Sequence, residues 1–259
     1  MQLIPFYKFE STGNDFIIID NRGGEVRLDV EKIERICDRR FGIGGDGLIL
    51  LSAHVGFDFA MEYYNSDGLP GSFCGNGGRA AVAMGNMLNL IKEDGRFIAT
   101  DGPHAATIER VSNNLWHVEL EIADTVVERR DLINTGSPHH IVKVPNLNGF
   151  DVVTAGASLR NHPRFSPDGC NVNFVRDHGD HLEVRTYERG VESETLSCGT
   201  GVTAAAIEHH LESPDGRYSM KIKSPGGDLM VSFVKTQNRF HQIRLSGHTH
   251  LVFEGKYYL

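Results

Sequence analysis

Cysteine is scarce in this sequence of 259 residues, and the few that occur stand far apart. The four positions are Cys37, Cys74, Cys170 and Cys198. None of them forms a C-x-x-C pair, so the sequence predicts neither a disulfide scaffold nor a zinc or thioredoxin-like site. Cys37 lies on the apolar side of a predicted helix and Cys170 follows a turn, so we expect both to be buried core thiols.

Long apolar runs and runs of basic residues are also missing. No stretch approaches the roughly 18 apolar residues of a transmembrane helix. The segment MQLIPFYKFESTGNDF lacks the basic and apolar regions of a signal peptide. The net charge is −8 and Lys/Arg clusters do not occur, which argues against a nucleic-acid partner. We therefore expect a cytoplasmic protein that binds neither a membrane nor nucleic acid.

The sequence contains one glycine motif typical of nucleotide-binding sites, but the elements predicted around it are in the wrong order. The segment FGIGGDGLILL formally contains G-x-G-x-x-G at Gly42, Gly44 and Gly47. A dinucleotide site needs a strand before the glycines and a helix after them, because the pyrophosphate binds at the helix N-terminus. Here a helix is predicted before them and a strand after them, and no G-K-[ST] P-loop occurs. We predict no cofactor.

The strongest functional signal is the segment YERGVESETLSCGTGVTAAA, residues 187–206. It predicts the end of a strand, a loop, and a helix that starts at Cys198. A cysteine there faces backbone N–H groups that the helix cannot satisfy, and it feels the positive end of the helix dipole. Both effects favour a thiolate, so we expect the pKa of Cys198 to lie below the ordinary value of about 8.5.

The same arrangement occurs earlier, in SFCGNGGRAAVAM around Cys74, which lies 124 positions before Cys198. Four further pairs keep this spacing: Gly75/Gly199, Gly77/Gly201, Ala80/Ala204 and Ala81/Ala205. Gly226 also lies 124 positions after Gly102, which extends the repeat beyond the two helices. We therefore interpret the chain as two related halves of about 130 residues, each presenting one activated thiol.

Apolar periodicity predicts one central helix in each strand-rich half. The predicted helices cover residues 29–40, 74–90, 151–161 and 198–210, and Asp29 is a predicted N-cap. KIKSPGGDLMVSF predicts a hairpin. The last strand, HLVFEGKYYL, has no partner in its own half, and we expect it to return to the first one.

Two thiols at helix starts could form a redox pair, a metal pair or an acid–base pair. The thirteen histidines are scattered and the pairs at 139–140 and 209–210 are predicted at the surface or at helix ends, so metal binding is disfavoured. The glycine-rich helix starts donate N–H groups that suit a carboxylate. This favours proton removal from one face of an α-carbon by a thiolate and proton return to the other face by a thiol.

Taken in order, the motifs resemble the diaminopimelate epimerase family: FESTGNDFIIID, FGIGGDGLILL, YNSDG, FCGNGGRAA, NTGSPHHIV, NVNFV, YERG, SCGTGVTAA and SPGGDL. The resemblance covers nearly the whole chain. It implies a PLP-independent enzyme that interconverts LL- and meso-diaminopimelate for lysine and peptidoglycan-precursor synthesis. It also implies an α+β fold of two pseudo-symmetric domains, each a mostly antiparallel β-barrel-like sheet wrapped around a central helix.

We place the domains at 1–119 plus 251–259, which carry Cys74, and at 120–250, which carry Cys198. By the resemblance, Cys74 and Cys198 are the two catalytic bases. The amides of Gly75, Asn76, Gly199 and Thr200 would hold the reacting carboxylate. The distal carboxylate and amine would contact Asn14, Asn65, Asn171 and Arg189, Glu188 would lie near the reacting amine, and His139 and Ser137 would support the site.

Ser137 stands where the family often has Asn, which leaves recognition of the distal end of the substrate less defined than the reaction. Two-thiol racemisation of proline or hydroxyproline is the alternative within the same class, although the YERG segment argues against it. A binding protein without chemistry and a thiol redox protein are further alternatives. The substrate is predicted to be a small molecule, and formation of a homodimer is left open.

Overall fold

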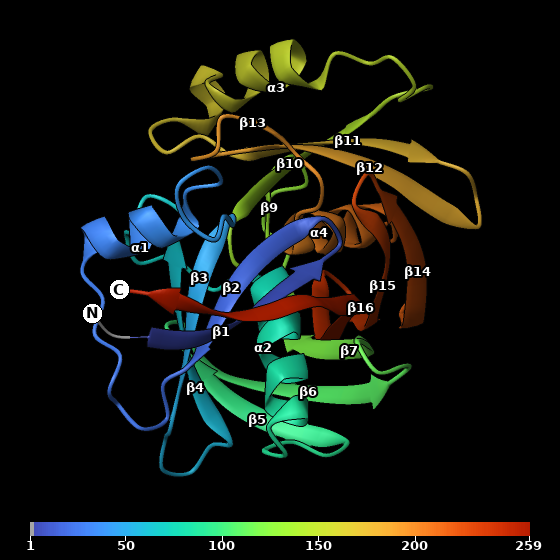
Figure 1. Ribbon diagram of the computed structural model, residues 1–259. Coiled ribbons are helices and arrows are strands. Elements are labelled where there is room, and N and C mark those ends of the chain that lie inside the picture. Colours follow the sequence, from blue (N-terminus) through green and yellow to red (C-terminus); the bar gives the residue numbers. More distant parts are fainter. Residues whose placement is uncertain (1–2) are drawn as a thin grey trace. The chain divides into compact units, whose positions relative to one another are not determined.

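The computed structural model describes residues 3–259, and the chain divides into two compact units (Figure 1). The first unit comprises Met1–Leu120 and Gly247–Leu259, and the second comprises Glu121–Ser246. The last strand therefore begins in the second unit and ends in the first. No helix among the described residues is both long enough and apolar enough to span a lipid bilayer.

The first part of the chain alternates strands with two helices. Its elements are β1 (Leu3–Ser11), β2 (Asn14–Asp20), α1 (Val30–Cys37), β3 (Gly47–Ser52), β4 (Phe59–Asn65), α2 (Gly75–Met87), β5 (Asp94–Ala99), β6 (Gly102–Arg110) and β7 (Leu115–Ile122).

The rest of the chain follows the same pattern. Its elements are β8 (Thr125–Val126), β9 (Ile133–Asn134), β10 (Pro138–Lys143), α3 (Val152–Arg160), the 3-10 helix η1 (Pro163–Phe165), β11 (Asn171–Asp177), β12 (His181–Glu188), β13 (Ser193–Thr195), α4 (Gly199–His209), β14 (Gly216–Ser224), β15 (Gly227–Thr236) and β16 (Arg239–Tyr258).

The sheet of the first unit closes on itself. Its strand order is β1-β2-β3-β4-β5-β6-β7-β16, and β16 also pairs with β1. The pairs β2/β3 and β4/β5 are parallel, and they are the pairs that α1 and α2 connect. Parallel neighbours need a crossover connection, so each helix follows from the direction of the two strands it joins.

The second unit uses the same order of elements, β16-β15-β14-β12-β11-β10-β9. Here α3 connects the parallel pair β10/β11, and α4 connects the parallel pair β12/β14. The expected α+β fold of two pseudo-symmetric, barrel-like sheets around central helices is thereby confirmed.

One detail of the predicted repeat is wrong by one residue. The hairpins β5–β6 and β14–β15 close at Ala99↔Gly102 and Ser224↔Gly227. Gly102 and Gly227 have positive φ angles of 126° and 140°, a region that favours glycine. The structural equivalent of Gly102 is therefore Gly227 and not Gly226, so one residue is inserted between the thiol helix and the hairpin of the second unit.

Helix α2 is buried on all sides from Asn76 to Gly85 and packs against β1, β2, β3, β4 and β6 (Figure 1). A helix can be enclosed in this way only if it presents no wide polar face. The helix is rich in glycine and alanine, which leave room for the large aromatic side chains that the surrounding strands contribute. The largest fully buried side chains of the first unit include Phe9, Phe16, Phe59, Phe97 and Trp116.

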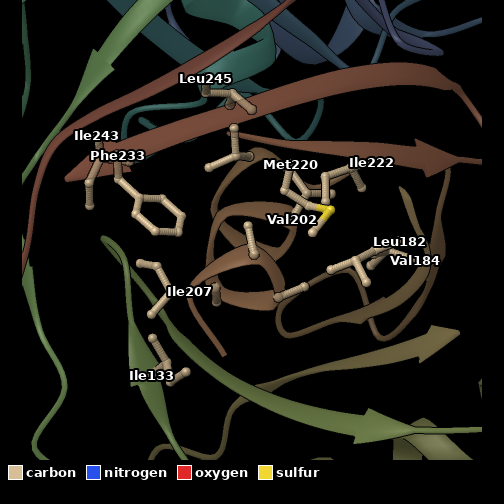
Figure 2. Close-up of a cluster of buried hydrophobic side chains, with 14 of the residues drawn as sticks. Ile133, Leu182, Val184, Val202, Ile207, Met220, Ile222, Phe233, Ile243 and Leu245 are labelled. Atoms are coloured by element: carbon tan, nitrogen blue, oxygen red, sulfur yellow. The ribbon is translucent and has the colours of Figure 1, made fainter. Parts of the chain in front are cut away.

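Helix α4 is enclosed in the same way, with every residue from Gly201 to Ile207 buried. Figure 2 shows Val202 and Ile207 of this helix among side chains such as Met220 and Phe233 from the surrounding strands. The two central helices therefore cannot shift without opening a core, and their first residues are held in fixed positions.

Helices α1 and α3 begin at Asp29 and Asp151, whose side chains accept hydrogen bonds from Lys32 N and Thr154 N. The predicted N-cap at Asp29 is confirmed. Helix α3 packs on β11 and β12, and Gly156 faces Tyr187, the residue that precedes Glu188. A Cβ at position 156 would lie 2.4 Å from Tyr187 Cβ.

We expect Gly156→Ala to lower the free energy of unfolding by about 1–3 kcal/mol, because neither backbone nor Tyr187 Cβ can yield to the added methyl group. Urea unfolding measures this change. Gly216→Ala is the matched control, since the nearest atom to its Cβ would be 3.8 Å away. Equal stability of the two variants would contradict the close approach of α3 to β12.

Candidate active site

The two thiols occupy the same position in their units. Cys74 is the N-cap of α2, and Cys198 is the N-cap of α4. Their carbonyl oxygens accept the first helical hydrogen bonds, from Gly78 N at 2.8 Å and from Val202 N at 2.9 Å. The backbone N–H groups between each cysteine and that first bonded residue have no acceptor within the helix. Each sulfur therefore lies at the positive end of a buried helix dipole.

The second glycine of each C-G-x-G segment is closely packed, more tightly in the second unit than in the first. A Cβ at Gly201 would lie 2.3 Å from Asn173 Oδ1, and a Cβ at Gly77 would lie 3.2 Å from Ile49 Cδ1. Glycine lets the first helical turn approach the neighbouring strand. The thiols are therefore positioned by contacts that the strands make with the helix backbone.

In the first unit, an amide network surrounds Cys74. Asn14 Oδ1 lies 3.6 Å from Cys74 Sγ and 3.4 Å from Asn76 Nδ2. The other end of the Asn14 amide is fixed, because its Nδ2 donates to Asp46 Oδ2 at 2.6 Å. Since a carboxylate only accepts hydrogen bonds, Asp46 determines that the oxygen of Asn14 faces the sulfur.

A charged cluster fixes Asp46 in turn. Arg39 donates to Asp46 Oδ1 at 2.8 Å and to both oxygens of Asp15, at 2.6 and 2.9 Å. Lys8 forms an ion pair with Asp15 at 2.7 Å. Burial of Asp15 disfavours its charge, but the hydrogen bonds from Arg39 and Lys8 outweigh burial and lower its pKa. The GGDG segment thus joins a network of fixed charges beside Asn14.

In the second unit, a chain of uncharged groups leads to Cys198. Thr200 Oγ1 lies 3.5 Å from Cys198 Sγ and 2.9 Å from His139 Nε2. On its other side, His139 Nδ1 accepts a hydrogen bond of 3.1 Å from Asn173 Nδ2. His139 therefore carries its proton on Nε2 and donates toward Thr200 or toward Ser137 Oγ, also at 2.9 Å.

His139 is fully buried, which contradicts the surface position predicted for the histidine pairs. Burial, helped by the charge of Arg189, lowers the pKa of His139 from 6.5 to about 3. The pair at 209–210 lies at a helix end, as predicted, since His209 is the last residue of α4 and His210 is its C-cap, buried and bonded through Nδ1 to Ala206 O at 3.0 Å. The prediction failed for His139 because strand β10 places its ring against Asn173 of β11 and Thr200 of α4.

Asn171 organises the YERG segment. Its side chain is buried, donates to Ser137 Oγ at 3.1 Å and accepts from Arg189 N at 2.8 Å. Next to it, Glu188 Oε2 accepts a hydrogen bond of 3.0 Å from Thr195 Oγ1, and burial raises the pKa of this carboxyl. The Arg189 side chain contacts Asp168 O at 3.4 Å.

Most of the predicted site residues of each unit lie close to its thiol or to its supporting network. Asn65 lies exposed at the end of β4, where it pairs with Gly47, the residue after Asp46. Three residues of these networks were not among the predicted site residues: Asp46, Asn173 and Thr186. Thr186 donates to Asn173 Oδ1 at 2.9 Å and so fixes the amide that bonds to His139. The alternation of Asn171 and Asn173 in NVNFV was the available signal, because both face one side of a strand.

A surface hollow of about 470 Å³ in the second unit lies away from these residues. Much of its lining is already bonded, since Lys143 lies 3.1 Å from Glu208, His209 lies 3.2 Å from Asp177, and Arg176 donates to Asn146 Oδ1 at 3.5 Å. We assign it no role, because it includes neither Cys198 nor any residue of the networks above.

Comparison with known sequences supports the resemblance that the motifs predicted. A sequence model described as diaminopimelate epimerase matches residues 6–119 and 132–249. A diaminopimelate epimerase from Flavobacterium psychrophilum is 46% identical over 257 residues, which cover 97% of this chain and 99% of that protein. The chain belongs to the diaminopimelate epimerase family. Another member of this family, from Chlorobaculum tepidum, is 39% identical, with 94% and 97% of the two chains covered.

Solved structures with the fold of this diaminopimelate epimerase family member are more distant in sequence. A PhzF-family phenazine biosynthesis protein from Bacillus anthracis has a TM-score of 0.77 at 15% identity, with 100% of both chains covered. A hydroxyproline epimerase from Agrobacterium vitis has a TM-score of 0.74 at 15% identity, with 98% of this chain and 92% of that chain covered. These similarities concern the fold alone.

The burial of neutral His139 predicts a pH-dependent stability. An unfolded chain takes up a proton on this histidine below pH 6.5, whereas the folded chain does so only near pH 3. The free energy of unfolding should therefore fall as the pH decreases through this window, by about 1.4 kcal/mol per pH unit for one proton. Urea unfolding at several pH values measures the slope.

In His139→Gln this contribution to the slope should disappear, because glutamine does not titrate. His140→Gln is the control, since His140 is half-buried and adjacent in sequence. The same slope in His139→Gln and in the wild type would show that His139 is not held neutral by burial.

Proposed function

We propose that this protein is an isomerase that interconverts LL-2,6-diaminopimelate and meso-diaminopimelate by a two-base thiol mechanism without a cofactor. The observation that carries the proposal is the repeated N-cap cysteine, at Cys74 and Cys198, in a chain 46% identical to a diaminopimelate epimerase. The reaction would serve lysine and peptidoglycan-precursor biosynthesis in the cytoplasm.

The proposed reaction begins with one cysteine as a thiolate and the other as a thiol. The thiolate takes the proton from the α-carbon, forming an S–H bond, and the electron pair of the C–H bond moves into the adjacent carboxylate. The thiol on the opposite face then gives its proton to the carbon. The configuration is inverted, and the two sulfurs have exchanged protonation states, so the enzyme is ready for the reverse direction.

The carboxylate gains charge when the α-proton leaves, and the helix starts can stabilise that charge. We assign this task to the N–H groups of Gly75, Asn76, Gly199 and Thr200. Their helix positions support the assignment, since these N–H groups have no acceptor within α2 or α4. Fixed donors of this kind favour the transition state over the substrate because they need no reorganisation during the reaction.

We assign recognition of the rest of the substrate to Asn14, Asn65, Asn171, Arg189 and Glu188. A guanidinium can hold a carboxylate through two parallel hydrogen bonds, which suits Arg189. The contacts of Asn171 support a positioning role, because its side chain already holds Arg189 N and Ser137 Oγ.

The proposal predicts that the protein exchanges the substrate α-hydrogen with deuterated solvent and that Cys74→Ala and Cys198→Ala lose epimerisation. Each variant lacks one of the two proton carriers, so turnover should fall by at least about 10²–10⁴-fold. Mass spectrometry of the substrate and chiral separation of the isomers measure the two processes.

The matched control is Cys37→Ala. Burial raises the pKa of Cys37 to about 11, so this thiol remains protonated and should not contribute to turnover. Absence of exchange in the wild type would favour a binding protein. Full activity of either thiol variant would refute the two-base assignment.

Substrate preference separates the proposal from proline racemisation. Diaminopimelate carries a second amino-acid group for Arg189 to bind, whereas proline does not. We expect turnover of both diaminopimelate isomers and none of proline or hydroxyproline, measured by chiral chromatography. Efficient turnover of proline would overturn the assignment of substrate while leaving the thiol mechanism intact.

A further inference from the structure

Arg79 of α2 is a buried cation without a counter-ion. Its side chain is fully buried, and no ion pair to it occurs among the described residues. Nη2 donates to Thr12 Oγ1 at 2.9 Å and to Asn76 Oδ1 at 3.0 Å, but Nε and Nη1 have no hydrogen-bond partner. An isolated buried charge is costly, so its presence one turn inside the Cys74 helix requires an explanation.

Of the ionisable groups around Arg79, Cys74 is the one whose charged form the guanidinium can stabilise without competition from another cation. Glu10 on β1 also acts on Arg79, but it makes no direct contact with the guanidinium: one carboxylate oxygen accepts from Gly13 N at 3.1 Å and the other lies 2.6 Å from His250 Nδ1. Asp15 on β2 is neutralised by Lys8 and Arg39, and Asp46 by Arg39. Burial lowers the pKa of Arg79 to about 10, while Cys74 and Glu10 oppose that change, so Arg79 remains charged near neutral pH.

Asn14 has the opposite effect on the same sulfur. Its Oδ1 faces Cys74 Sγ at 3.6 Å, and it can accept a hydrogen bond from a thiol but cannot donate one to a thiolate. Asp46 prevents the amide from turning its NH₂ group toward the sulfur. The second unit lacks such a pair, since the position equivalent to Arg79 is the uncharged Thr203, whose hydroxyl donates to Gly199 O at 2.9 Å.

We propose that Arg79 and the Asp46-fixed amide of Asn14 act as opposing positioning residues that balance the thiol and thiolate forms of Cys74. Arg79 stabilises the thiolate and Asn14 stabilises the thiol. A cysteine that must remove a proton in one direction and supply one in the other needs both forms to be accessible. This inference deepens the proposed function and rests on it for the role of Cys74 in proton transfer.

The test titrates Cys74 without substrate, so its result does not depend on the proposed activity. Cys198→Ala is the parent protein, and burial raises the pKa of both Cys37 and Cys170 to about 11, so alkylation of these two thiols does not interfere below that pH. The rate at which iodoacetamide alkylates Cys74, followed by mass spectrometry from acid to alkaline pH, gives the pH of its ionisation.

Arg79→Gln keeps a hydrogen-bonding side chain without the charge, and Arg79→Met removes both. In each, ionisation of Cys74 should move up by at least about one pH unit, which means about tenfold slower alkylation below the midpoint. Arg79→Lys should restore most of the parent behaviour. An unchanged midpoint in a folded Arg79→Gln or Arg79→Met protein would overturn the role of Arg79.

Asp46→Asn should move the midpoint in the opposite direction, because the Asn14 amide is then free to turn its NH₂ group toward Cys74. Asp15→Asn controls for loss of a carboxylate from the same cluster, since Asp15 makes no side-chain contact with the Asn14 amide. A higher midpoint in Asp46→Asn, or an equal downward shift in Asp15→Asn, would overturn the role of the fixed amide.

Discussion

The structure depends on two helices that are enclosed by strands and begin at a cysteine. A helix must leave its first N–H groups without helical acceptors, and an enclosed helix cannot pass all of them to bulk water. In α2 and α4 the N-cap is a sulfur that forms no capping hydrogen bond, so the helix starts keep their ability to bind an anion.

The repeat gives the two thiols the same backbone setting, but the side chains around them differ in kind. Cys74 lies among fixed charges and an amide held by a carboxylate, whereas Cys198 adjoins a chain of neutral groups that ends at His139. Two-base epimerisation requires opposite protonation states on the two sulfurs at any moment, and different surroundings bias which sulfur carries the proton. A duplicated fold thus supplies equal geometry, and substitutions around each helix supply the chemical asymmetry.

Local signals predicted the helices, the N-cap at Asp29 and the position of each thiol, since capping and apolar periodicity involve residues close in sequence. Contacts between strands were not accessible in this way. The surface prediction for His139 failed because Asn173 and Thr200, which enclose it, are brought close by a parallel β10–β11 pair and by α4. The GGDG segment lies between a helix and a strand, as predicted, but its contact with Asn14 arises only when β2 and β3 pair.

Several amides that would contact substrate are already bonded before any substrate arrives. Asn14 is held by Asp46, and Asn171 by Ser137 and Arg189. This limits how they can act, because an amide with one end fixed offers the other end in a single orientation. Binding then costs little side-chain entropy, and an error in substrate orientation leaves a buried polar group unpaired. Ser137 fits this scheme, since its hydroxyl bonds to both Asn171 and His139 and so connects Asn171 to the hydrogen-bonded chain that leads to Cys198.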